Sequence, residues 1–155
     1  MEFLKLIVAG SCIICAYSDA QVITPIKNTI DFGTIALADN SASYQLRVRW
    51  NGQVVHDPQI IIVSQPSPAE FELSEFPVYT SLAINVIAGT SETTKVTGVA
   101  AVEQFTISNF DYLPSQTTDA AGMATIYLGA TLTTSGSNSY TDGMYNLPLT
   151  LEVNF

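Results

Sequence analysis

The sequence predicts an all-β protein, an antiparallel sandwich of about eight or nine strands, and three observations support this prediction. After about residue 20, the 155-residue chain alternates apolar and polar residues almost throughout, which is the pattern of half-buried strands. The same region, after about residue 20, contains no long stretch with helical periodicity. Gly, Pro, Ser and Asn separate the alternating segments at short intervals, as is typical of sandwich folds.

The first twenty residues have the features of a secretory signal peptide. Lys5 precedes an apolar stretch over residues 6–16, and a small-x-small cleavage pattern ends at Ala20. The apolar stretch is shorter than the roughly twenty residues that cross a bilayer as a helix. We therefore expect residues 1–20 to be a cleaved signal peptide and residues 21–155 to form a single exported β-sandwich domain, located in the periplasm, on the cell surface or outside the cell.

Both cysteines of the chain lie inside this predicted signal. Cleavage would remove Cys12 and Cys15 and leave no disulfide, zinc or thiol chemistry. Many small exported domains depend on disulfides, so this domain must be stabilised by strand pairing and apolar packing, or by neighbouring subunits. A lipid anchor on Cys12 is the weaker alternative, because the leucine usually found three residues earlier is missing.

The chain is strongly acidic, with a formal net charge of −9. Removing residues 1–20 lowers the acidic residues from 14 to 12 and the basic residues from 5 to 4, which leaves a net charge of −8. Such a surface repels nucleic acid and anionic lipid. We therefore exclude nucleic acid as a partner and expect no stable membrane span after cleavage.

The clearest predicted strand runs over residues 44–50 and ends at the pair Asn51-Gly52. Asn-Gly between two alternating segments is typical of a two-residue β-hairpin with a type I′ turn, in which both central residues have positive φ. We expect the return strand to end near Pro58 and a separate strand over residues 60–63. The side chains that share the inner face of the first strand are Tyr44, Leu46, Val48 and Trp50.

Further strands are predicted wherever apolar residues alternate between turn signals. They cover residues 29–37, 70–74, 81–87, 93–96, 104–108, 124–132 and 149–155. Loops are expected over residues 64–69, 111–122 and 133–143. In the final strand, one face carries Leu149, Leu151, Val153 and Phe155.

The sequence contains few residues that could act in catalysis, and their arrangement does not indicate an active site. His56 is the single histidine, and in a strand its neighbour Asp57 would face the opposite side. The acids Glu70 and Glu72 lie on the polar face of a predicted strand, which explains them as a solvated surface. We expect no enzyme activity, no catalytic or metal-binding residue and no cofactor; calcium bound by loop acids such as Asp111 is a weak alternative.

Four segments of the chain together form a further sequence pattern. The segment Ile30-Asp31-Phe32-Gly33-Thr34-Ile35 opens it, and residues 69–73 lie in the middle. Residues 128–132 contain Gly129 in a leucine-glycine-x-x-leucine strand, and Gly143-Met144-Tyr145 precedes the final strand. In their order and spacing these segments resemble the bacterial domain-of-unknown-function family 4402.

The resemblance implies an exported, immunoglobulin-like or pilin-like sandwich and no catalytic residue. At these positions Gly33 and Gly143 can adopt positive φ at turns, and Tyr145 can cap a sandwich corner through its hydroxyl. The ending also resembles that of chaperone–usher pilins and of spore-coat-U-like pilus subunits. It differs from the pilin pattern in the absence of a cysteine pair and in having Asn154 as the penultimate residue.

Two functions follow from these features. The first is a structural subunit of a bacterial surface or fimbria-like extracellular assembly, exported by a Gram-negative cell. Its partners would be copies of itself or related subunits, added through strands such as residues 21–28. The second is a monomeric surface adhesin that recognises glycans or host protein through the loops over residues 111–122 and 133–143, with Tyr112 and Tyr140 as contacts.

Overall fold

The computed structural model describes residues 26–88, 94–95, 105–137, 140, 145–147 and 149–155. Within these residues the protein consists of strands and turns and contains no helix, which confirms the predicted fold class. The predicted signal peptide, residues 1–20, lies outside the described residues. The described strands outnumber the eight or nine expected, because several have only two or three residues. They are β1 (Ile26–Asn28), β2 (Ile35–Leu37), β3 (Gln45–Val48), β4 (Val54–His56), β5 (Ile60–Ile62), β6 (Ala69–Leu73), β7 (Ser81–Ala88), β8 (Thr94–Lys95), β9 (Thr106–Asp111), β10 (Ser115–Thr117), β11 (Ala124–Thr133), β12 (Tyr145–Asn146) and β13 (Leu149–Asn154).

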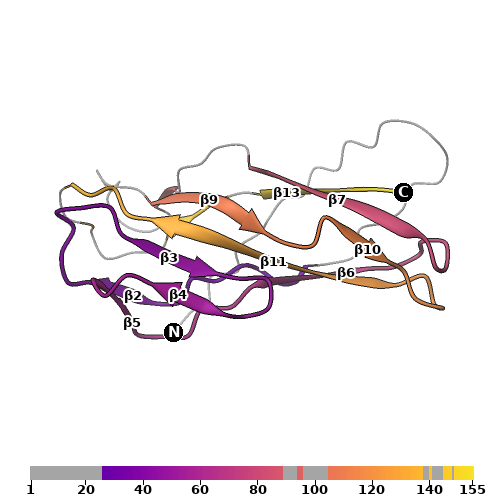
Figure 1. The fold of residues 1–155 in the computed structure, drawn as a ribbon, viewed down its shortest axis with the longest axis horizontal. Coiled ribbons are helices and arrows are strands. Elements are labelled where there is room, and N and C mark those ends of the chain that lie inside the picture. The colour runs from indigo at the N-terminus through magenta and orange to yellow at the C-terminus, as the bar shows by residue number, and fades with distance from the viewer. Residues whose placement is uncertain (1–25, 89–93, 96–104, 138–139, 141–144, 148) are drawn as a thin grey trace.

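The strands form a large and a small antiparallel sheet and two short ribbons. The large sheet has the order β1-β6-β11-β3-β4, and β9 also pairs with β11. The small sheet has the order β10-β7-β13, and the ribbons are β12-β8 and β2-β5. The longest strand, β11, runs along the long axis of the molecule in Figure 1, and β7 and β13 of the small sheet, which are antiparallel to each other, lie roughly along the same axis.

Strand β11 organises the large sheet because it pairs with three other strands. Its first half pairs with β6, and its second half pairs with both β3 and β9. Thr131 faces Arg47 on β3 and Ser108 on β9, so β3 and β9 lie on opposite edges of β11. The alternation predicted over residues 124–132 places every second residue on one face, and all of these residues are buried: Ala124, Ile126, Leu128, Ala130 and Leu132.

The core consists of two apolar clusters. Cluster 1 lies between the two sheets and includes buried side chains from β6, β7, β9, β11 and β13. Cluster 2 is formed by Leu46, Ile60, Phe105 and Leu132, with half-buried side chains of the β2-β5 ribbon packed against it. Phe32 packs against both clusters. Fully burying one such large side chain contributes about 1.5–3 kcal/mol, so these clusters are the main source of stability.

The hairpin between β3 and β4 is confirmed, but its predicted turn type is wrong. The amide of Gly52 donates to the carbonyl of Arg49 at 2.9 Å, and the amide of Arg49 donates to the carbonyl of Gln53 at 2.8 Å. Gly52 has φ +81°, whereas Asn51 does not have positive φ. This is a type I turn followed by a left-handed glycine, the three-residue loop that closes with a bulge, and the Asn51 side chain accepts from the amide of Gln53 at 3.1 Å.

Two predicted boundaries also differ from the structure. Residues 29–37 do not form one strand, because Gly33 has φ +71° and the chain turns there before β2 begins at Ile35. The predicted loop over residues 111–122 contains a strand, β10, which pairs with β7. The sequence of β10 is polar, so it lacks the apolar alternation that predicts a half-buried strand.

Candidate assembly surface

The final strand, β13, pairs with β7 over its whole length. The register runs from Leu149 opposite Ala88 to Asn154 opposite Ala83, without a shift. Leu149 is buried, and Leu151 and Val153 are half-buried against cluster 1. On the outer face, the Asn85 amide donates to Glu152 Oε2 at 3.2 Å. The predicted alternation of β13 is therefore confirmed for these described side chains.

The opposite edge of β13 pairs with no other described strand. Four strands end the two sheets besides β13, but three of them, β1, β4 and β10, have only three residues each. The fourth, β9, has six residues, but a register shift interrupts its pairing with β11, and Asn109 there has φ +50°. Short and bulged edges are poor templates for another strand. Within the described residues, β13 is the long and uninterrupted edge.

An apolar tip lies at the end of β13. Phe155 is 60% exposed, and its ring packs edge-on against Phe76 with a centroid distance of 5.3 Å. The turn between β6 and β7 adds Val78 and Tyr79, which are 52% and 71% exposed, and Tyr79 has φ +53°. The final strand therefore ends beside exposed apolar surface. Phe155 lies one residue beyond β13 and is largely exposed, although its ring contacts the buried Phe76.

The segment Ile30-Asp31-Phe32-Gly33-Thr34-Ile35 contains a tight turn at Gly33 that holds Phe32 in place. Asp31 Oδ1 accepts from the amide of Gly33 at 2.7 Å, and the backbones of Asp31 and Ser67 exchange two hydrogen bonds. A Cβ atom on Gly33 would lie 2.1 Å from the carbonyl oxygen of Ser64. Gly33 is thus required by its positive φ, as the sequence predicts, and also by close backbone contact.

Gly129 lies where the end of β3 comes into close contact with β11. A Cβ atom on Gly129 would lie 2.1 Å from the carbonyl oxygen of Val48 and 2.8 Å from the amide nitrogen of Trp50. On the other edge of β11, Gly129 faces Asp111. The Asp111 carboxylate accepts from the amide of Trp50 at 3.4 Å and lies 3.9 Å from the Arg47 guanidinium. The missing side chain therefore lets Asp111 connect β9 to the end of β3.

Tyr145 belongs to an aromatic group at the edge of cluster 2. Its ring packs edge-on against Phe105 at 5.0 Å and against Tyr140 at 6.1 Å, and Tyr140 stacks on Phe105 at 4.1 Å. The Tyr140 hydroxyl accepts from the amide of Ser135 at 2.8 Å. Tyr145 thus contributes ring packing at this corner, and Gly143 lies outside the described residues.

A family model described as "Domain of unknown function (DUF4402)" matches residues 23–155. The chain belongs to this family. No curated protein and no solved structure matches it. The match includes the turn at Gly33, the close approach at Gly129 and the whole of β13, so all three are features of this DUF4402 domain.

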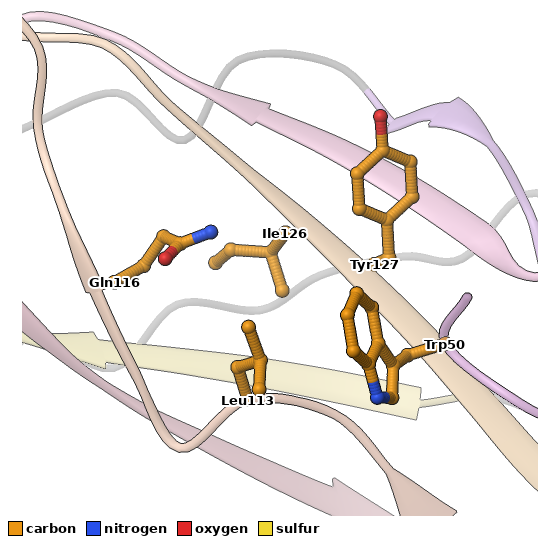
Figure 2. Close-up of a pocket in the computed structure, with 5 residues that line it drawn as sticks. All are labelled: Trp50, Leu113, Gln116, Ile126 and Tyr127. Carbon is orange, nitrogen blue, oxygen red and sulfur yellow. The ribbon is translucent and has the colours of Figure 1, made fainter.

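A small cavity in the DUF4402 domain lies beside its single tryptophan. Its volume is about 120 Å³, and it is lined by Trp50, Leu113, Gln116, Ile126 and Tyr127. Figure 2 shows Gln116 and Leu113, which lie in the predicted loop over residues 111–122, on one side and Trp50 and Tyr127 on the other, with Ile126 between Gln116 and Trp50. Trp50 is half-buried rather than fully in the core, because it lies in the turn after β3.

Two other acidic side chains, Asp57 and Asp39, accept hydrogen bonds from nearby groups. The Asp57 carboxylate accepts from the amide of Gln45 at 2.8 Å and connects the β3-β4 hairpin at the end opposite its turn. His56 is exposed. The Ser41 hydroxyl donates to Asp39 at 2.5 Å, and this hydrogen bond is the main cause that lowers the pKa of the Asp39 carboxyl.

Among the described residues, no three His, Cys, Asp or Glu side chains gather as a metal site. The described part also contains no helix long and apolar enough to cross a membrane.

Proposed function

We propose that this DUF4402 domain is a non-enzymatic, exported structural subunit of a bacterial surface or fimbria-like extracellular assembly, secreted by a Gram-negative cell. The observation that supports this proposal most is the edge of β13, which is six residues long, regular and unpaired within the described chain. Such an edge offers a row of backbone donors and acceptors to another strand. Its half-buried Leu151 and Val153 would gain burial when a strand is added.

Part of the predicted donor segment, residues 21–28, pairs within its own chain. Ile26–Asn28 forms β1, which pairs with β6 of its own chain. Residues 21–25 of this segment lie outside the described residues. A partner strand at β13 therefore comes from these few residues or from a different part of another subunit.

Placing a charge on the inner face of β13 tests the proposal. Val153→Lys puts an ammonium group at the open edge, where natural edge strands use lysine to prevent pairing. We expect the variant to remain folded by circular dichroism but to lose the assemblies that wild type forms, as seen by negative-stain electron microscopy. The matched control is Val55→Lys on the three-residue edge strand β4, where Val55 is 51% exposed; it should assemble as wild type does. Equal assembly of both variants and wild type would contradict the proposal.

The alternative function, a monomeric adhesin, is favoured by the cavity beside Trp50. An aromatic ring beside a small apolar hollow is able to stack against a sugar ring. Because Trp50 is the one tryptophan of the chain, its fluorescence reports directly on this site. If the protein is a structural subunit, titration with simple oligosaccharides should leave the emission maximum unchanged. A saturable shift that disappears on Leu113→Asp substitution would instead support the adhesin.

A further inference from the structure

We propose that β13 pairs with β13 of a second copy of this chain, antiparallel and across a two-fold axis at Leu151. This inference rests on the proposed structural function and specifies the contact through which two subunits bind each other. The pairing would join two small sheets, each with the order β10-β7-β13, into one continuous six-stranded sheet. The partner is identical, so the same strand serves both sides of the contact.

The charge distribution favours a second copy at this strand. The chain has a net charge of −9, so two copies repel each other over most of their surfaces. From Leu147 to Phe155, however, the sequence contains a single charged residue, Glu152. The β13 edge is therefore a place where two copies approach with little like-charge repulsion. It also lacks proline and inward-pointing charge within Leu149–Asn154, two of the devices that prevent edge pairing.

The alternation of β13 restricts the register of this pairing. Residues directly opposite each other in an antiparallel pair lie on the same face of the sheet. Apolar positions must therefore face apolar positions of the second copy, so the axis has to pass through a residue rather than between two. Two registers pair five residues of each strand: one is centred on Leu151 and the other on Glu152.

The two registers differ in what they place opposite Glu152. The register centred on Glu152 puts two carboxylates directly opposite each other, which is destabilising. The register centred on Leu151 places Glu152 opposite Thr150 of the second copy. It also places Leu151 opposite Leu151, and Leu149 opposite Val153, so that the half-buried inner face of one strand continues into that of the other. Leu151 is thus the centre of the contact.

Single cysteines test this register, because the described chain contains no cysteine. The full precursor is expressed and exported protein is recovered, oxidised with copper phenanthroline and analysed on non-reducing gels. Side chains directly opposite each other are within reach of a disulfide, while those displaced by two residues are not. We expect Leu151→Cys to form about tenfold more cross-linked dimer than Glu152→Cys. Val55→Cys on β4 is the exposed control, and wild type measures any linkage through Cys12 or Cys15.

The outcomes separate this inference from the proposed function. Preferential linkage of Leu151→Cys supports the two-fold pairing. Preferential linkage of Glu152→Cys, or equal linkage of all three variants, overturns the register. If Leu151→Cys stays unlinked while wild type still assembles in electron micrographs, the strand at β13 comes from another segment, such as residues 21–25, and the two-fold pairing is wrong. If nothing links and nothing assembles, both the pairing and the structural function are wrong.

Discussion

Replacing Gly129 with alanine is expected to lower the free energy of unfolding by about 3 kcal/mol or more, because the added methyl group has no space. Its Cβ would lie 2.1 Å from the carbonyl oxygen of Val48 and 2.7 Å from the carbonyl carbon of Arg49. These are backbone atoms of a neighbouring strand, so they cannot rotate away. Either β3 moves away from β11 or Asp111 loses its contact with the amide of Trp50. Urea unfolding followed by Trp50 fluorescence measures the loss.

Gly52→Ala is the matched control for Gly129→Ala. Gly52 has φ +81°, but a Cβ there would have no atom within 4 Å. The control should therefore cost only the strain of a left-handed alanine, on the order of 1 kcal/mol. Equal destabilisation by the two substitutions would show that the close approach at Gly129 is not the cause.

Replacing Phe32 with alanine is expected to destabilise the protein by about 3 kcal/mol, the range for loss of a large aromatic side chain from a core. Phe32 is half-buried, yet it packs against both apolar clusters. Its removal leaves a space between the sandwich core and the β2-β5 ribbon. Chemical denaturation followed by two methods measures the effect. Trp50 fluorescence reports the loss of tertiary structure, and circular dichroism of the backbone reports the loss of secondary structure.

Phe155→Ala is the matched control for Phe32→Ala. It deletes the same side chain at a position that is 60% exposed and that contacts Phe76 edge-on. An aromatic pair of this kind contributes about 0.5–1.5 kcal/mol, so the control should lose about 1 kcal/mol. A Phe32→Ala variant no less stable than Phe155→Ala would contradict the role of Phe32 as the link between the two clusters.

The sequence is sufficient to predict the elements whose pattern is local. Alternation over residues 124–132 and 149–155 identifies the inner faces of β11 and β13, because the side-chain period of a strand is two. The glycine at position 33 is predictable as a turn residue, and its positive φ confirms this. The absence of helical periodicity predicts the fold class for the same reason.

Features that depend on distant residues could not be predicted in this way. Asn51-Gly52 is compatible with more than one hairpin turn, and in the structure the end of β3 is fixed by Asp111, some sixty residues away, which accepts from the amide of Trp50. The cavity beside Trp50 and the ring packing of Tyr145 likewise arise from segments far apart in sequence. The open edge of β13 is a property of the sheet order, which alternation alone does not specify.

The mass of the exported protein in solution tests the proposed structural role most directly. Light scattering coupled to size exclusion gives this mass over a range of concentrations, and electron microscopy of the same fractions shows the form of any assembly. Added salt screens the net negative charge and should strengthen association. We predict dimers and larger assemblies that grow with concentration and are lost in Val153→Lys. A folded wild-type monomer at every concentration and salt level would contradict the proposal.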